Sequence, residues 1–150
     1  MLEAALAYAH LIALLSWVVF IGSCTALARA DWLNTAALAR LARVDRIAGV
    51  AAMAVLITGA ARVMWGAKGA AWYLDQPLLW GKLALWLAMV AGGVSASRRI
   101  QAWKRSSTRG GGLPAAAEVA AVRRRLMAAS HLMVVVPLLA VLLARGIAVR

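Results

Sequence analysis

Four long apolar stretches run through this chain of 150 residues, and they limit its possible folds more than any other feature. They lie near 4–28, 46–64, 78–97 and 127–146. A helix needs about 20 residues to cross about 30 Å of hydrocarbon, and each stretch is close to that length or longer. Open strands would leave backbone groups unpaired in lipid, and the alternating pattern of a barrel is absent. The sequence therefore predicts an all-α fold, a single domain over 1–150 that forms a four-helix transmembrane bundle.

The basic residues are concentrated in two of the connections between these stretches. The chain carries a net charge of +12, yet four arginines lie in the 29–46 connection and eight lysines and arginines in 98–125. This is the positive-inside pattern, so both connections are expected on the cytoplasmic side and both termini on the non-cytoplasmic side. The pattern accounts for the charge without nucleic acid, and we expect no nucleic-acid partner. The Arg clusters are instead expected to touch anionic lipid headgroups.

Both basic connections also show helical signals. Asn34 is a good N-cap for a short helix over 36–43 that leads into the second apolar stretch. The glycines at 110–112 predict a flexible break, and Pro114 then begins a helical pattern that runs into the fourth stretch. The fourth helix is therefore predicted to be longer than the membrane and to extend into the cytoplasm.

Two features predict how the helices pack. Small residues recur every four positions in the third stretch, which lets another helix approach closely: Ala84, Ala88, Gly92 and Ala96. That helix belongs either to the same chain, to a second copy in a homo-oligomer, or to a partner membrane protein. Pro137 should bend the fourth helix and leave the Met133 carbonyl without its usual donor.

Two basic side chains lie inside apolar stretches and are the leading candidates for a site. His10 lies near the start of the first stretch and Lys82 near the start of the third. Insertion into a bilayer disfavours a central Lys by about 2.5–3.5 kcal/mol, so such residues are often functional. Both lie within about 10 Å of the non-cytoplasmic interface, given the helical rise of about 1.5 Å per residue. A lysine at this depth either faces the bundle interior or extends its amine to the interface, and the sequence leaves both open.

Three further residues are predicted to share this non-cytoplasmic site. Arg62 closes the second apolar stretch at the same level, Trp80 lies beside Lys82, and Trp17 lies one heptad below His10. The connection over 65–77 is rich in aromatic residues, which form either an interfacial belt or a lid over a ligand.

Other kinds of chemistry have little support in the sequence. His131 lies near the cytoplasmic start of the fourth stretch, too far in depth from His10 for both to ligate one haem. We expect His131 to pair with Asp45 instead, in an interhelical hydrogen bond. Cys24 is the single cysteine, so it forms no internal disulfide, and no cluster has the spacing of metal ligands. The sequence leaves open whether the protein is an enzyme.

Three segments resemble a bacterial family of small predicted membrane proteins of unknown function. They are RVMWGAKGAAWYLDQPLLWGK at 62–82, ARVD at 42–45, and the closing segment that begins PLLA at 137. The resemblance implies a multi-pass protein of the bacterial inner membrane with four helices, and it supplies no activity.

A more distant resemblance links the layout to the haem-binding, four-helix protoporphyrinogen oxidase family. That family carries a His early in its first helix and a Lys early in its third, and His10 and Lys82 occupy the corresponding places. The resemblance implies a site for haem or a related tetrapyrrole and the oxidation of a porphyrinogen. In such a site we expect His10 to ligate the iron or to exchange protons, and Lys82 and Arg62 to hold an anionic group such as a propionate.

Two functions follow from these observations. The first is binding of a tetrapyrrole, a quinone-like molecule or another redox ligand near the outer leaflet. The second is a non-catalytic subunit or assembly factor that docks a partner through its small-residue helix face.

Overall fold

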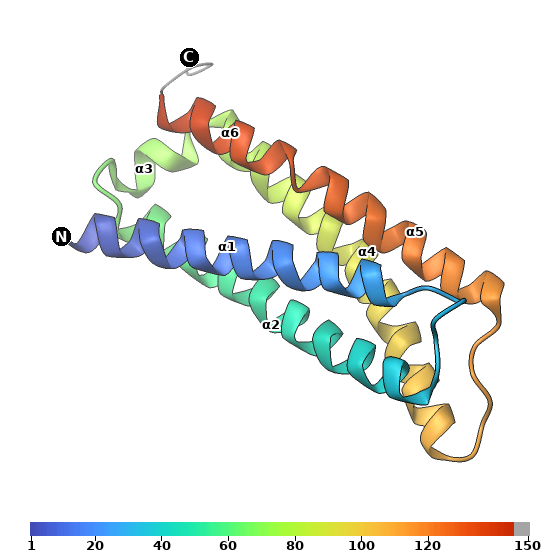
Figure 1. Ribbon diagram of the computed structural model, residues 1–150. Coiled ribbons are helices and arrows are strands. Elements are labelled where there is room, and N and C mark those ends of the chain that lie inside the picture. The colour runs from blue at the N-terminus through green and yellow to red at the C-terminus, as the bar shows by residue number, and fades with distance from the viewer. Residues whose placement is uncertain (146–150) are drawn as a thin grey trace.

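The structure is a bundle of long helices without a strand in the residues that it describes, 1–145 of this computed structural model (Figure 1). The all-α prediction is therefore confirmed. In chain order, the helices are α1 Leu2–Leu27, α2 Thr35–Trp65, α3 Gly69–Leu74, α4 Pro77–Thr108, α5 Ala116–Leu132 and α6 Val135–Ala144. Residue 146, where the fourth predicted span ends, lies outside the described residues, as does Arg150.

Four segments are long and apolar enough to cross a membrane, as the sequence predicts. They are Leu2–Leu27, Thr35–Trp65, Pro77–Thr108 and Ala116–Leu142, the last of which joins α5 to most of α6. The fourth helix begins well ahead of its apolar stretch, as expected. The third is also longer than predicted, because α4 continues through the polar residues to Thr108. At about 1.5 Å per residue, its 32 residues span about 48 Å, well beyond the hydrocarbon.

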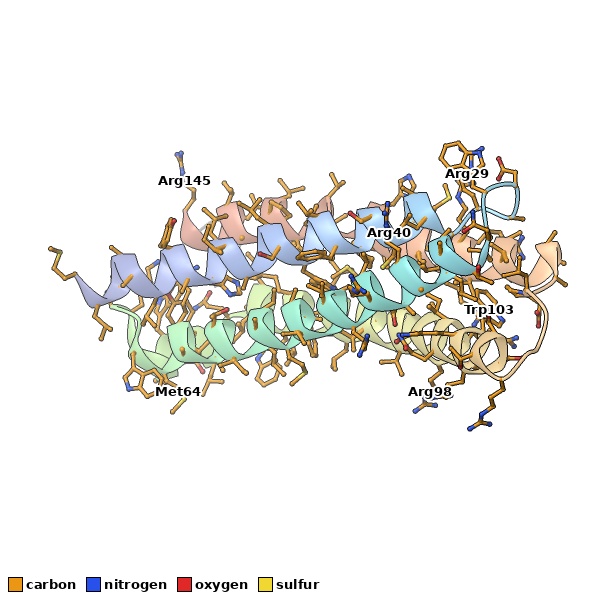
Figure 2. The ribbon with its side chains drawn as sticks, turned by 60° about the horizontal axis from the view of Figure 1, so that its bottom comes forward. Arg29, Arg40, Met64, Arg98, Trp103 and Arg145 are labelled. Carbon is orange, nitrogen blue, oxygen red and sulfur yellow. The ribbon has the colours of Figure 1, made fainter. Side chains whose placement is uncertain are left out.

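The long helices form a ring in which each contacts two neighbours. α1 packs beside α2 and α5, and α4 packs beside α2 and α5, while the backbones of the diagonal pairs α1–α4 and α2–α5 do not approach closely within residues 1–145. Connections 28–34 and 109–115 lie at one end of the bundle, here named the loop end. Met1, α3 and Arg145 lie at the other, named the terminal end (Figures 1 and 2).

The tightest packing lies toward the loop end. Leu38, Leu41, Ile100, Val119 and Val122 are all at most 1% exposed, and they belong to the parts of α2, α4 and α5 outside the predicted apolar stretches. Burial there removes apolar surface from water, so the hydrophobic effect stabilises the packing. Helices that pack within lipid do not gain this stabilisation, because the lipid tails are themselves apolar. This packing explains why the polar segment 98–108 is helical: Ile100 and Trp103 form its buried face.

The terminal end is packed much less completely. Beyond Ala13, Val55, Met89 and Met133 toward that end, Gln76 is the one buried residue in the described chain. At the loop end, the contact of α1 with α5 closes the ring of helices. At the terminal end, α6 follows α5 and packs beside α4, but it does not approach α1. The ring of helices is therefore open between α1 and α6.

Local signals read from the sequence act as predicted at both helix breaks. Asn34 accepts a hydrogen bond through its side-chain Oδ1 from the backbone N–H of Ala37, at 2.8 Å, and so caps α2. The 36–43 segment is continuous with the second span in one helix. Pro137 has no N–H for the Met133 carbonyl, and the helix breaks at 133–134, between α5 and α6.

The prediction that His131 pairs with Asp45 is wrong. Asp45 is 7% exposed and faces α4, where its Oδ2 accepts hydrogen bonds from Ser97 Oγ and from Gln101 Nε2, both at 2.7 Å. His131 is exposed, and its Nδ1 lies 2.7 Å from the carbonyl oxygen of Met127 in its own helix. The cause is the order of helices in the ring, because α2 is adjacent to α4 and does not touch α5.

Candidate functional site

Three basic residues stand on the interior faces of three different helices at the terminal end. His10 lies one turn before the buried Ala13 and two turns before the buried Trp17 on α1. Arg62 follows the buried Val55 on α2 by seven residues, and Lys82 precedes the buried Met89 on α4 by seven. Seven residues make nearly two full turns, so each basic residue lies on the same face of its helix as the buried residue seven positions away. We name the group His10, Arg62 and Lys82 the His10 site.

Lys82 faces the bundle rather than the outside. Its side chain is partly buried, whereas Ala84 and Ala88 are exposed. Two residues correspond to about 200° around a helix, so Lys82 and Ala84 lie on opposite faces of α4. A spacing of four residues drifts by about 40° per step, so the stripe turns toward the interior face by Ala96. Of the stripe, Ala96 is buried, and a Cβ added at Gly92 would meet no atom within 4 Å. Within this chain the stripe is therefore unoccupied except near its loop end.

A hydrogen bond to α2 fixes the His10 ring. The Nδ1 atom lies 2.9 Å from Thr58 Oγ1, and the Thr58 hydroxyl donates its own proton to the carbonyl of Ala54, at 2.6 Å. Because that proton is already used, the Thr58 oxygen accepts from Nδ1–H of the imidazole. The ring is then held as the tautomer that carries its lone pair on Nε2, which forms no hydrogen bond within residues 1–145. A second partner that fixes the tautomer is also typical of histidines that ligate metals.

Gly59 makes room for this arrangement. A Cβ at this position would lie 3.3 Å from Cε1 of His10, which is tighter than nearly all real contacts of a Cβ atom. The absent side chain lets the imidazole lie against the α2 backbone beside Thr58. The sequence indicates Gly59 as a close-packing residue, but it does not assign Thr58. The signal for Thr58 is present, since it is the one hydroxyl side chain in the 46–64 stretch.

The charges of the His10 site act on one another and have no acidic partner among the described residues. The positive charges of Arg62 and Lys82 both act on the His10 ring, and that of Arg62 acts on Lys82. The ion pairs of the described chain are Arg29–Asp31 and Arg99–Glu118, so neither Arg62 nor Lys82 has a carboxylate partner there. Glu3 and Asp75, the acidic residues nearest this end in sequence, are exposed.

The two predicted tryptophans have different positions. Trp17 is 4% exposed and lies below His10 on the same face of α1, so it joins the interior wall. Trp80 is 52% exposed, and its Nε1–H donates to the carbonyl of Leu74 at 2.9 Å. The hydrogen bond from Trp80 thus stabilises the turn between α3 and α4. The Trp80 side chain lies on the face of α4 opposite Lys82. The structure does not bring it together with the other residues of the site.

Two buried polar atoms without partners were not indicated by the sequence. Trp86 follows Lys82 by one turn on α4, and its Nε1–H is buried with no acceptor in the described chain. Gln76, the N-cap residue of α4, is 5% exposed, and its Oε1 is likewise without a donor. Such orphaned groups are costly to leave inside a protein, so each adds hydrogen-bonding capacity for a ligand or water at this end.

The aromatic connection forms the short helix α3 across the terminal end. Trp72 and Tyr73 are partly buried, with their rings in an edge-to-face contact at 5.0 Å between centroids. The Lys68 ammonium lies 3.9 Å from the centroid of the Trp72 ring, a cation–π contact. α3 contacts both α2 and α4, so it connects the two helices that carry Arg62 and Lys82.

The metal-binding capacity of the His10 site is limited to one protein ligand. No group of three His, Cys, Asp or Glu side chains comes together in the described part of the chain. His131 lies in the loop-end half of the apolar stretch 127–146 and is exposed, so the structure does not bring it together with His10. A metal here would have to arrive within its own chelating ring, with His10 as an axial ligand.

Comparison with known proteins supports the architecture. No curated protein and no solved structure matches the chain. A family model described as "Predicted membrane protein (DUF2214)" matches residues 2–148, which is nearly the whole chain. With its four helices capable of spanning a membrane, the protein belongs to this DUF2214 family of membrane proteins.

Proposed function

We propose that the protein binds an amphipathic anionic ligand of the tetrapyrrole class, such as haem, at the His10 site. His10 Nε2 would bind the iron, and Arg62 and Lys82 would pair with the acid groups of the macrocycle. The observation that carries this proposal is the convergence of a free imidazole lone pair with two cations that have no carboxylate partner.

An anionic ligand explains why two cations without an acidic partner face the interior at the same end of the bundle. Cations within spans usually pair with another group or line a functional path. Arg62 and Lys82 instead repel each other, and an anion between them removes both the repulsion and the cost of partial burial. A guanidinium also binds a carboxylate through two parallel hydrogen bonds, which suits the propionate group of a haem.

The apolar part of the ligand also has a place. Ligand sites in helix bundles are formed by side chains on facing helices, and the His10 site draws on α1, α2 and α4. The ring of helices is open between α1 and α6 at this end, so a flat macrocycle can enter from the lipid. Trp17 offers an apolar wall below His10.

We also propose that the protein lies in a bacterial inner membrane with its loop end in the cytoplasm. The arginines of the two basic connections gather at that end, as Arg29 and Arg98 do in Figure 2. The positive-inside rule then places the His10 site in the outer leaflet.

Visible absorption of the purified protein tests the ligand. After expression with ample haem, the protein should show a Soret band that His10→Ala removes. His131→Ala is the matched control and should leave the band unchanged, because His131 is exposed elsewhere. Lys82→Met keeps most of the stem but deletes the charge, and should weaken haem retention about 10- to 100-fold, as expected for one charge-assisted hydrogen bond.

A colourless protein that stays folded would overturn this proposal. The docking alternative would then lead, with the exposed Ala84 and Ala88 and the open space beside Gly92 as the face that receives a partner helix.

A further inference from the structure

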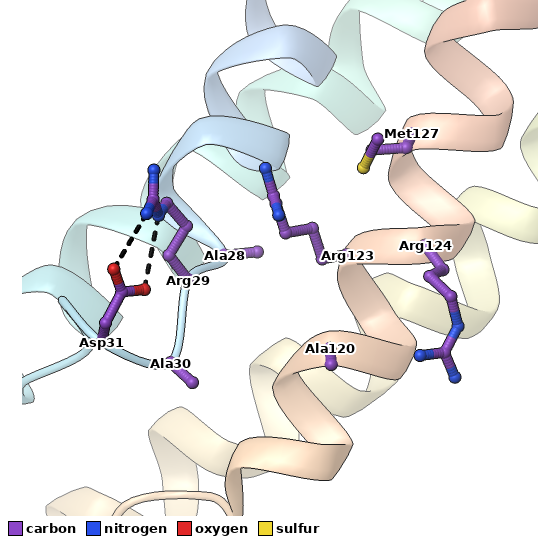
Figure 3. A pocket seen from close by; sticks show the side chains of 8 residues that line it. All are labelled: Ala28, Arg29, Ala30, Asp31, Ala120, Arg123, Arg124 and Met127. Atoms are coloured by element: carbon purple, nitrogen blue, oxygen red, sulfur yellow. Dashed lines mark hydrogen bonds and ion pairs between the residues drawn. The ribbon is translucent and has the colours of Figure 1, made fainter.

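A small basic pocket lies at the loop end, far from the His10 site. It opens between the segment that follows α1 and the face of α5, with a volume of about 220 Å³ (Figure 3). We name it the Arg pocket. Arg29, Arg123 and Arg124 line it together with Asp31, and Ala28 and Met127 form part of its apolar wall.

The charges of the Arg pocket are arranged in advance of any ligand. Arg29 donates from Nε and Nη2 to the two carboxylate oxygens of Asp31, at 3.3 and 2.9 Å, and its guanidinium lies 4.3 Å from the centroid of the Trp32 ring. The hydrogen bond from Arg29 is the main reason that the pKa of Asp31 is lowered, and the charge of Arg123 also contributes. Asp31 is therefore ionised at neutral pH, and the pocket keeps a net charge of about +2 from its three arginines and one carboxylate.

Arg123 has unused binding capacity. Its Nε–H is buried and has no acceptor in the described chain. The one carboxylate that lines the pocket, that of Asp31, is already held by Arg29. Arg124 contributes to the lining, but its exposed side chain points away from Arg123 in Figure 3, so its guanidinium lies at the rim. It forms no ion pair within residues 1–145.

The pocket lies at the level where lipid headgroups are found. α1 ends at Leu27, immediately before the pocket residues Ala28 and Arg29, and the fourth apolar stretch begins at Met127. The guanidinium groups lie at the edge of two apolar spans, where they can bind the phosphate of a lipid headgroup. Met127 lies on the hydrocarbon side, where it can contact the acyl chains of the same lipid. The volume is below the roughly 300–1,000 Å³ of sites for drug-sized molecules, which fits a headgroup phosphate better than a larger solute.

From this geometry we infer that the Arg pocket is a specific site for an anionic phospholipid that presents two negative charges. Basic pockets between helices at a cytoplasmic interface commonly hold such headgroups. Arg123 binds the phosphate oxygens and Arg124 adds positive charge at the rim, while Arg29 is held in place by Asp31 and Trp32.

Lipid retention by the whole protein tests this inference. The protein is equilibrated in mixed micelles with cardiolipin, which carries two phosphates, and phosphatidylglycerol, which carries one, at matched total charge. Retained lipids are then weighed by native mass spectrometry. The wild type should prefer cardiolipin about tenfold. Arg123→Gln and Arg124→Gln should each lower that ratio about fivefold, the effect of about 1 kcal/mol per interfacial arginine.

Arg98→Gln is the matched control, since Arg98 is an exposed arginine of the loop end outside the pocket. It should weaken both lipids alike and leave their ratio unchanged. Equal retention of the two lipids by the wild type, or the same fall in ratio with Arg98→Gln, would overturn the site. Displacement of the lipid by inorganic phosphate at constant ionic strength would show a site for free anions and would overturn the lipid assignment.

Discussion

Removal of the Asp45 carboxylate should destabilise the bundle far more than removal of an exposed carboxylate. Asp45 joins α2 to α4 through two hydrogen bonds of 2.7 Å, from Ser97 and Gln101. A hydrogen bond to a charged group contributes about 1.5–3 kcal/mol. Asp45→Ala removes both hydrogen bonds, but it also removes the desolvation cost of burying a carboxylate without a cation. We therefore expect the loss in free energy of unfolding to be smaller than the sum of the two hydrogen-bond contributions.

The remaining contacts refine the magnitude. Gln101 keeps its second bond, from Nε2 to the carbonyl of Ala42 at 2.9 Å, whereas the Ser97 hydroxyl loses its interhelical acceptor. We therefore expect Asp45→Ala to lower the free energy of unfolding by about 2–4 kcal/mol. Ser97→Ala should cost less, and the double-mutant cycle of Asp45 with Ser97 should give a coupling energy of about 1–2 kcal/mol.

Unfolding in mixed detergent micelles, followed by far-UV circular dichroism, measures these differences. Asp31→Ala is the control, because the Asp31 side chain is 57% exposed and exposed ion pairs contribute at most about 1 kcal/mol. Equal losses for Asp45→Ala and Asp31→Ala, or a coupling energy near zero, would refute the argument that this buried network holds α2 against α4.

Three other changes test separate parts of the structure. Gly59→Val should push the His10 ring off α2 and lower the midpoint of thermal unfolding, whereas Gly49→Val, where an added Cβ meets no atom within 4 Å, should not; equal shifts would contradict the contact. Gly92→Leu should leave the monomer as stable as before but reduce self-association in size-exclusion chromatography; an unchanged oligomer would show that the stripe faces lipid. A periplasm-dependent reporter fused after Arg150 should be active, and activity of a cytoplasm-dependent reporter there would invert the topology.

Much of the fold could be predicted because its signals are local. The length of each apolar stretch sets a spanning helix, and Asn34 and Pro137 act within one turn of themselves. The extension of α4 to Thr108 was missed because its residues carry the charges of a loop. The buried residues Met89, Ala96, Ile100 and Trp103 are spaced as on one face of a helix. Because this spacing continues past residue 97, it indicates that the helix extends beyond the apolar stretch.

The candidate site was only partly predictable, because it depends on which helices are neighbours. His10, Arg62 and Lys82 could be identified as basic residues at one depth, and the register of each helix then turns them inward. The partners of Asp45 could not be predicted, because no residue near Asp45 in the sequence indicates that α2 packs against α4 rather than α5. Thr58 and Trp86 act through contacts that only the assembled bundle reveals.

The central claim is that His10 Nε2 is an open ligand position in a site completed by Arg62 and Lys82. Rescue by imidazole tests it most directly. His10→Gly, titrated with haem in nanodiscs, should fail to give the Soret band of the wild type, and added imidazole should restore the band by filling the space of the lost ring. The same addition should not change the amount of haem that wild type or His131→Gly retains, because His10 already binds the iron in both. Full haem binding by His10→Gly without imidazole, or no rescue by imidazole in a folded variant, would contradict the claim.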